Sequence, residues 1–463
     1  MTSRHKRLEF NLPVVVLFHT SLVKEQVMRV LCAFLLIACT SSAAAAEPDA
    51  AIPDALQRYV DRPEPDYGWE LLATHETEHG TVHELLLVSQ KWQDIVWKHS
   101  LLVYEPPRID HPEHMLLMVT GGRTGRRPDQ DDMQLGLKLA ALCGARIATL
   151  HQVPNQPLLG DRVEDDLITE TWLKYLETGD ETWPLLFPMV KSAVKAMDAL
   201  TEFSADRWET EVKGFVMTGA SKRGWTSWLT PVADKRVIAT APLVIDTLNF
   251  PVQMQYQLDT WGDYSEQIHD YTSKGLVRPE GEPRTPREEQ LWQMMDPYTY
   301  RSVLKLPKLL VNGTNDPYWV VDAMNNYWND LEGPKFILQV PNAGHGLDGG
   351  RESALTTVAV FFRHAAMGRS LPAMSWAPSN SGGRLKLQVR ADPRPVDARL
   401  WSAVSSSKDF RKSEWTSAPL QERDQDYEGS LELPDRGHGA VFGELQFDFS
   451  GLVYSLTTQV FRQ

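Results

Sequence analysis

The chain has 463 residues, of which 42% are hydrophobic and 23% charged, and its formal net charge is −14. This length exceeds one small domain, and the composition excludes a globally disordered protein. A strongly acidic chain repels nucleic acid, so the sequence predicts no nucleic-acid partner.

Residues 1–46 form a predicted targeting region, and residues 28–46 within it have the features of an export signal. One arginine is followed by an apolar run, too short to span a membrane, and then by small residues. Leu36–Cys39 resembles a lipobox, which would make Cys39 the lipid-bearing first residue of the mature chain. Ala44–Ala46 resembles an ordinary cleavage site, and the sequence leaves both open. We expect an exported protein that is periplasmic, lipid-anchored or secreted.

Residues 47–370 have the pattern of one large α/β domain. Three extended runs rich in β-branched and aromatic residues come first, at Trp69–Thr74, Thr81–Val88 and Ile95–Tyr104. Short buried strands then alternate with helices that have apolar periodicity. Strands that alternate with helices predict a mostly parallel sheet.

Two later segments depart from this alternation. The first, at about residues 247–300, is rich in Gln, Tyr, Trp and charge. It is too long for a simple connection, so it predicts a helical cap inserted over the sheet. The second, residues 371–463, has short alternating runs that predict a small C-terminal antiparallel β domain.

The stretch FVMTGASKRGWTSW (residues 215–228) places Ser221 where a strand ends and a helix begins. Small neighbours permit the cramped turn that exposes a nucleophilic hydroxyl, and a helix N-terminus favours developing negative charge. The usual pattern is G-x-S-x-G. Gly219 fits it, but Arg223 occupies the second glycine position and the glycine follows at Gly224. The alternative is a serine that only caps the helix.

Two further residues follow predicted strands. Asp316 comes just after the strand in LLVNGTNDPYW, and His345 just after the strand in FILQVPNAGHG, with space for one helix and one strand between them. The order Ser…Asp…His is that of α/β-hydrolases. We therefore expect Ser221 to attack, His345 to take and return the proton, and Asp316 to fix the imidazole tautomer. Asp246, after the preceding strand, is the alternative acid.

Stabilising the oxyanion of such a reaction needs two backbone N–H donors. The first is expected from Lys222, directly after the nucleophile. The second is expected from Gly121 or Gly122 at the end of LLMVTGG, although these glycines could instead only make a turn.

Arg223, beside Ser221, allows two interpretations. It can meet a carboxylate or phosphate of the substrate, which predicts an anionic substrate. It can instead be a structural partner of an acidic side chain, such as Glu164, Asp165 or Asp166. Four tryptophans are candidate pocket residues and equally candidate core residues: Trp172, Trp225, Trp261 and Trp319.

Two groups of metal-ligand residue types have simpler interpretations. Three histidines share a four-residue spacing: His75, His79 and His83. Gly80 indicates a hairpin turn among them, where helical spacing has no meaning. Three acids precede a predicted helix, where they would cap it: Asp129, Asp131 and Asp132. The sequence therefore predicts no metal site and no cofactor.

The motifs GASKRG, NGTNDPYW and NAGHG, in this order after strands, resemble those of the PhoPQ-activated pathogenicity-related family. The resemblance runs over roughly residues 55–370 and includes YVDRPEPDYGWE, VTGG, EDDLITETW and MDPYTYR. It implies an exported bacterial protein with an α/β-hydrolase-like fold, linked to virulence under the PhoP–PhoQ two-component system. A secreted proliferation repressor of a social amoeba belongs to the same family. The resemblance supplies no substrate.

Two functions from different classes follow from the sequence. The first is an exported serine hydrolase that cleaves an ester or amide in a small-molecule or peptide substrate. The second is a catalytically silent signalling or binding protein that uses the surface of a hydrolase fold. Only an activated serine should react with a fluorophosphonate, so this reagent discriminates between them.

Overall fold

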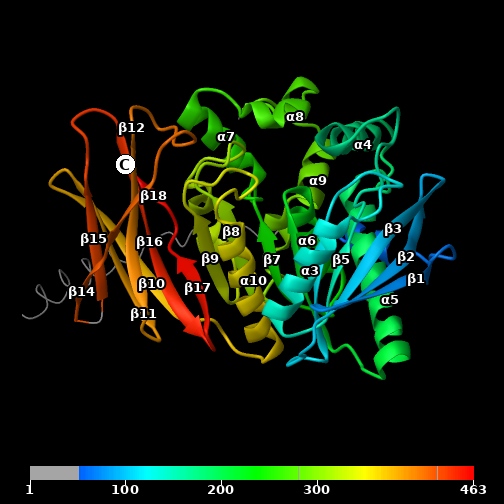
Figure 1. Ribbon diagram of the computed structural model, residues 1–463. Helices are drawn as coiled ribbons and strands as arrows, with labels where there is room; N and C mark the ends of the chain where they lie inside the picture. The colour runs from blue at the N-terminus through cyan, green and yellow to red at the C-terminus, as the bar shows by residue number, and fades with distance from the viewer. Residues whose placement is uncertain (1–51, 280, 425) are drawn as a thin grey trace, which may run out of the picture. The chain divides into compact units, whose positions relative to one another are not determined.

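The computed structural model describes residues 52–279, 281–424 and 426–463, and Ile52–Gln463 forms one compact unit (Figure 1). The predicted signal region, with the candidate lipidation site Cys39, lies outside the described residues. Within the described ranges, no helix is both long and apolar enough to cross a membrane.

A nine-stranded sheet forms the centre of the fold, in the order β1-β2-β3-β5-β4-β6-β7-β8-β9. The first three strands pair antiparallel, and β3 also pairs antiparallel with β5. From β5 to β9 every neighbouring pair is parallel, so the predicted mostly parallel sheet is confirmed. The strands are β1 (Gly68–Thr77), β2 (Gly80–Trp92), β3 (Ile95–Glu105), β4 (His114–Val119), β5 (Ile147–Leu150), β6 (Gly214–Ala220), β7 (Val237–Leu243), β8 (Lys308–Gly313) and β9 (Lys335–Val340).

Helices cover both faces of this sheet because its strands are apolar on both sides. Leu117 of β4 belongs to one buried cluster and Leu116 to another, as the alternation of side chains along a strand requires. The first cluster contains α2 (Ala55–Val60), α5 (Leu186–Trp208) and α6 (Lys222–Ala233). The second contains α3 (Gln130–Cys143) and α10 (Arg351–Ala366). The predicted capping role of the acids before α3 is confirmed, since Asp129 and Asp132 form a capping box.

The segment between β7 and β8 is helical, as the predicted cap requires. It contains α7 (Phe250–Trp261), η1 (Glu266–Ile268), α8 (His269–Ser273), α9 (Pro286–Met295) and η2 (Pro297–Tyr300). Figure 1 shows α7 and α8 beyond the ends of the parallel strands, with α8 near α4 (Glu164–Thr178). The prediction of a helix between Asp316 and β9 is wrong. Only the short turns η3 (Ala323–Asn326) and η4 (Trp328–Asp330) form there. Asparagine side chains in this stretch bond to other segments instead, which competes with a helix.

The last part of the chain forms two antiparallel sheets, as its alternating pattern predicts. One has the order β10-β11-β15-β14, and the other β13-β12-β16-β17 with β18 paired to β16. The second sheet packs on the parallel one, because β17 contacts β9 and α10. The domain limits suggested by the sequence remain predictions. The strands are β10 (Ala373–Ser381), β11 (Arg384–Asp392), β12 (Asp397–Ser405), β13 (Thr416–Pro419), β14 (Gln421–Arg423), β15 (Asp426–Glu432), β16 (His438–Phe449), β17 (Leu452–Thr457) and β18 (Phe461–Arg462).

The final strand also binds the helical segment. Arg462 donates from Nε to Asp322, 2.8 Å away, and from Nη2 to the hydroxyls of Tyr256 at 2.9 Å and Thr260 at 2.8 Å. Tyr256 and Thr260 lie on α7, and Asp322 lies in the loop after β8. One side chain of β18 therefore joins α7 to the loop that follows Asp316.

Candidate active site

Ser221 stands between β6 and α6 in a strained backbone conformation, with φ 57° and ψ −123°. A Cβ at Gly219 would lie 2.6 Å from the carbonyl oxygen of Arg223, and a Cβ at Gly224 would lie 2.9 Å from that of Gly219. Both glycines are therefore required for the turn to close on itself. Position 223 can hold an arginine because its side chain leaves the turn. This explains why the second glycine stands one residue later than in the usual pattern.

The structure brings together three side chains that follow three parallel strands. His345 Nε2 lies 2.9 Å from Ser221 Oγ, and His345 Nδ1 lies 2.7 Å from Asp316 Oδ2. Because an ionised carboxylate only accepts hydrogen bonds, Nδ1 is the protonated nitrogen and Nε2 is free to accept from the serine. Asp316 is only 5% exposed and also accepts the backbone N–H of Tyr318 at 2.9 Å. The carboxylate is therefore held on both sides.

Tyr318 packs on the imidazole of this group. The centroids of the Tyr318 and His345 rings are 4.3 Å apart, with 32° between the ring planes. Burial raises the pKa of Tyr318, and the nearby Asp165 and Asp316 raise it further, so the phenol stays protonated. Sequence reasoning missed this residue, although the DPYW motif after the strand contains it.

Asp246, the alternative acid, does not contact the imidazole. Its carboxylate accepts a hydrogen bond from the Tyr327 hydroxyl. Burial raises the pKa of Asp246 to about 7, against the hydrogen bond from Tyr327, and the charges of Asp316 and Asp322 raise it further. Asp316, and not Asp246, is the acid that the structure pairs with His345.

The expected oxyanion donors lie in different settings. Lys222 is the first residue of α6, where a backbone N–H has no intrahelical acceptor. The loop after β4 lies beside the Ser221 turn, because Val119 pairs with Gly219 in parallel register. Gly121 and Gly122, however, line a second cavity and not the one beside Ser221. The role of these backbone donors stays a prediction.

Gly121 has a packing role of its own. A Cβ at this position would lie 2.6 Å from Nη2 of Arg223. The glycine therefore leaves the space through which the guanidinium passes. A substitution here would displace Arg223 whether or not the backbone N–H binds an oxyanion.

The proposed substrate contact of Arg223 is corrected by its ion pair. Both of its terminal nitrogens lie 2.8 Å from the two oxygens of Glu164, and Nε donates to the Val153 carbonyl at 2.5 Å. The residue is only 8% exposed and does not line the cavity beside Ser221. Burial would raise the pKa of Glu164, but the hydrogen bonds and charge of Arg223, with Gln156, lower it to about 2. The arginine thus has the structural role that the sequence left as the alternative.

Lys222 is paired in a similar way. Its Nζ lies 2.9 Å from Asp165 Oδ2 and 3.4 Å from Glu164 Oε2. Asp165 also accepts the hydroxyl of Tyr271, which lies on α8, at 3.0 Å. The two cations that follow Ser221 are therefore both compensated by the first residues of α4.

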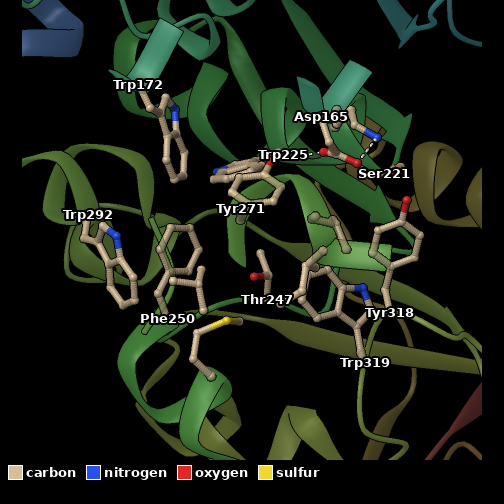
Figure 2. Close-up of a pocket in the computed structure, with 15 residues that line it drawn as sticks. Asp165, Trp172, Ser221, Trp225, Thr247, Phe250, Tyr271, Trp292, Tyr318 and Trp319 are labelled. Carbon is tan, nitrogen blue, oxygen red and sulfur yellow. Dashed lines mark hydrogen bonds and ion pairs between the residues drawn. The ribbon is translucent and has the colours of Figure 1, made fainter. Parts of the chain in front are cut away.

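A largely apolar cavity opens beside Ser221 (Figure 2). Trp225 and Trp319 both line it, as predicted for pocket residues. The indole N–H of Trp225 donates to the Met295 carbonyl at 2.6 Å, which fixes the ring at the cavity wall. Trp172, also predicted as a pocket residue, lines the cavity too, whereas Trp261 is not among its lining residues. Most of the other lining residues come from the helical segment and were missed: Phe250, Met254, Ile268, Tyr271, Val277 and Trp292. The aromatic richness of residues 247–300 was the available signal.

The described residues were also considered for a metal site away from Ser221. Among the described residues, no group of three or more His, Cys, Asp or Glu side chains could hold a metal ion. Of the three spaced histidines, His83 is buried and contacts the Thr74 hydroxyl at 3.1 Å. His79 lies outside the strands, in the turn between β1 and β2.

A mostly parallel sheet covered by helices, with a serine in a strained turn after β6 and its histidine and aspartate after β9 and β8, defines the α/β-hydrolase fold class. The family comparison agrees with the motifs. The chain belongs to the PhoPQ-activated pathogenicity-related protein family, whose model matches residues 56–411.

Individual relatives and solved structures were also compared. The chain is similar to autocrine proliferation repressor protein A of Dictyostelium discoideum, with 31% identity over 378 residues that cover 77% of this chain and 76% of that protein. Acetyl xylan esterase 1 from Thermoanaerobacterium sp. JW/SL YS485 has a TM-score of 0.48 at 15% identity, covering 68% of this chain and 95% of that one. An acetyl xylan esterase from Paenibacillus sp. R4 has a TM-score of 0.47 at 12% identity, with coverages of 66% and 92%. At these TM-scores neither activity nor substrate transfers to this chain.

Proposed function

We propose that the protein is a serine hydrolase that cleaves an ester or an amide. The observation that carries the proposal is the position of His345, which bridges Ser221 Oγ at 2.9 Å and Asp316 Oδ2 at 2.7 Å beside an open cavity. A helix-capping serine needs no imidazole at hydrogen-bond distance, whereas a nucleophilic serine needs a base there.

The chemistry follows from these contacts. Ser221 Oγ attacks the carbonyl carbon while His345 Nε2 takes the hydroxyl proton, and the carbonyl oxygen becomes the oxyanion. We expect the backbone N–H of Lys222, at the start of α6, to donate a hydrogen bond to that oxygen. His345 then returns the proton to the leaving alcohol or amine, which departs and leaves an acyl group on Ser221. A water molecule, deprotonated by the same imidazole, releases the acid and restores the serine.

Labelling with a fluorophosphonate tests the proposal. We expect one covalent adduct per chain, located at Ser221 by peptide mass spectrometry, because only an activated serine displaces fluoride from the reagent. Ser221→Ala should not be labelled, and His345→Ala should be labelled far more slowly at an unchanged melting temperature. A folded wild-type protein that resists the reagent would contradict the proposal.

The second candidate is a secreted signalling or binding protein that keeps the fold without the reaction. It is supported by the name of the Dictyostelium discoideum relative, a proliferation repressor that is 31% identical. Signalling activity that persists in Ser221→Ala would favour this candidate. Signalling that disappears together with labelling would join the two functions in one site.

We also propose that the protein is exported and anchored by a lipid on Cys39. The support is the Leu36–Cys39 motif in the sequence. Intact mass spectrometry of the mature protein should find a diacylglyceryl group on Cys39, and the protein should partition into detergent. An unmodified N-terminus at Ala46 or Glu47 would show ordinary cleavage instead.

A further inference from the structure

The cavity beside Ser221 carries an inference about the substrate, which rests on the proposed function. We infer that the part of the substrate held beside the scissile bond is an uncharged, apolar group of aromatic type. The support comes from the walls of the cavity, its charges and its position relative to the serine.

The walls are a chain of aromatic rings in edge-to-face contact. Trp172 and Trp225 have centroids 6.0 Å apart with 85° between their planes. Trp225 and Phe250 are 5.5 Å apart at 84°, and Phe250 and Trp292 are 5.8 Å apart at 82°. Such pairs leave ring edges and faces available to a further ring, which gains both area burial and quadrupole contacts. An aromatic group in the cavity therefore continues an arrangement that the protein has already built.

The serine lies at one end of this space. Figure 2 shows Ser221, Asp165 and Tyr318 on one side and Trp172, Phe250 and Trp292 on the other. A carbonyl carbon next to Ser221 Oγ therefore leaves the rest of the group directed among the rings. The hydroxyl of Thr247, which lies between the two sides, can bond one neutral polar atom without adding a charge.

The charges of the cavity argue against an anion. Asp165 and Lys222 are the charged side chains among its lining residues, and they are paired with each other at 2.9 Å. Arg223, the other cation near the serine, is bound to Glu164 and lies outside the lining. A carboxylate or phosphate in the cavity would therefore lose its hydration, and the described residues that line the cavity include no unpaired cation to compensate its charge. The inference is therefore the opposite of the anionic substrate that Arg223 led us to expect, and the ester series below tests one against the other.

Two matched ester series, followed by proton release, test the inference on the wild-type protein. The acyl series consists of the methyl esters of acetic, phenylacetic and 4-carboxyphenylacetic acid. The alcohol series consists of the acetates of methanol, benzyl alcohol and 4-carboxybenzyl alcohol. In one of the two series we expect the phenyl member to exceed both other members in kcat/KM by at least tenfold. Methyl members that match the phenyl members in both series would overturn it. A carboxylate member that matches the phenyl member in the series that prefers phenyl over methyl would also overturn it.

Boronic acids test the same point without a chosen leaving group. Phenylboronic acid should inhibit at a concentration at least tenfold below methylboronic acid and below 4-carboxyphenylboronic acid, since all three add to the same serine oxygen. Equal inhibition by the three compounds would overturn the inference.

A variant pair in the cavity wall adds a second measurement. Met254→Asp places a charge among the rings, and Met254→Leu keeps the site apolar. The ratio of kcat/KM for the phenyl and methyl esters should fall at least tenfold in Met254→Asp relative to Met254→Leu, and an unchanged ratio contradicts the inference. If Met254→Asp does not fold, the boronate comparison on the wild-type protein still decides.

The outcomes also separate the inference from the proposed function. A wild-type protein that is labelled by fluorophosphonate at Ser221 but shows no preference for the phenyl members is a serine hydrolase with another substrate. A protein that is not labelled at Ser221 fails the proposed function itself.

Discussion

The two sides of Ser221 are built from opposite chemistry. On one side, Lys222 and Arg223 follow Ser221 and are bound by acidic residues of α4. On the other side, rings from α4, α6 and the helical segment line a cavity with no unpaired charge among the described residues. A cation beside a nucleophile is easily interpreted as a substrate contact. Here the ion pairs are already complete, so they hold the turn, and the apolar side is where we propose that the substrate is recognised.

Both sides meet at Ser221, and replacing the residues of this centre should have the largest effect on turnover. Ser221→Ala, His345→Ala and Asp316→Asn should each lower kcat by roughly 10³-fold or more, because the three side chains act as one unit. A double variant should lose little more than a single one. Steady-state rates on a phenyl ester, with thermal melts to show that each variant is folded, provide the check. Full turnover by Ser221→Ala would reject the assignment.

Mutations on the ionic side should lower the stability of the fold without changing the preference between substrates. Arg223→Gln leaves the partly buried Glu164 carboxylate without its bidentate partner, so the free energy of unfolding should fall by about 2–4 kcal/mol. The values of kcat/KM for the phenyl ester and its carboxylate partner should decrease by the same factor. Chemical denaturation and the matched ester pair measure both quantities. A loss confined to the carboxylate ester, at unchanged stability, would restore Arg223 as a substrate contact.

A matched control for this variant is Arg399→Gln. Arg399 pairs with Asp397 at 2.7 Å, and the two side chains are 44% and 38% exposed. Because exposed ion pairs contribute little, this variant should change stability by no more than about 0.5 kcal/mol.

Asp246 is a second carboxyl that can be compared with Glu164. It is buried without a cation as its partner, whereas Glu164 is paired with Arg223. Asp246 has its pKa raised to about 7 by burial, whereas Arg223 holds the pKa of Glu164 at about 2. A raised carboxyl pKa means that the folded state binds the proton more tightly. The contribution of protonated Asp246 to the free energy of unfolding is complete below the ordinary carboxyl pKa of about 4. It is lost as the pH rises through about 7. Its slope is at most about 1.4 kcal/mol per pH unit.

Asp246→Asn should therefore flatten the decline of stability between pH 5 and pH 7.5. Asp296, whose pKa burial also raises to about 7, keeps part of the slope in the variant. Denaturation midpoints across this pH range measure the difference. Equal slopes in the two proteins would show that Asp246 ionises normally in the folded state.

Apart from the Arg399 control, the smallest effect is expected at the outer edge of the apolar side. Arg462→Gln removes the contacts to Tyr256, Thr260 and Asp322, which join α7 to the loop after Asp316. Stability should fall by about 1–2 kcal/mol, since hydrogen bonds to a charged group are lost. Hydrogen exchange should rise in α7 but not in β6. Unchanged exchange in α7 would show that other contacts hold this helix.

Much of the fold and three residues of the site could be predicted from the sequence. Short apolar runs that alternate with helices specify a parallel sheet, and polar residues placed just after such runs must meet at one edge of it. Ser221, Asp316 and His345 could be selected on this basis, because each local motif reports its own place on a strand. The catalytic assignment of these residues still depends on the experiments above.

The ion pair of Arg223, the cavity wall and the segment before β9 depend on contacts between residues far apart in the chain, which a local sequence pattern does not predict. Arg223 and Glu164 are 59 residues apart, so the sequence could offer the acid only as one of several partners. Trp172, Trp225 and Trp319 could be proposed as pocket residues, but only as equal candidates for the core, because packing decides which face of a helix lines a cavity. The helix predicted between Asp316 and β9 failed because asparagine side chains there, such as Asn325, bond to distant backbone.

The position of Arg462 along the chain has a consequence for biosynthesis. A ribosome makes the chain from its N-terminus, so this arginine is translated after every other residue of the site. Strands β6, β8 and β9 can pair, and Ser221 can meet His345, while later residues are still being added. The ties from Arg462 to α7 cannot form until β18 has been translated. Gln253 and Gln257 of α7 can already donate to the carbonyls of Ala323 and Tyr318 at that stage. Arg462 therefore adds the last contacts to a helix that earlier contacts have already begun to hold.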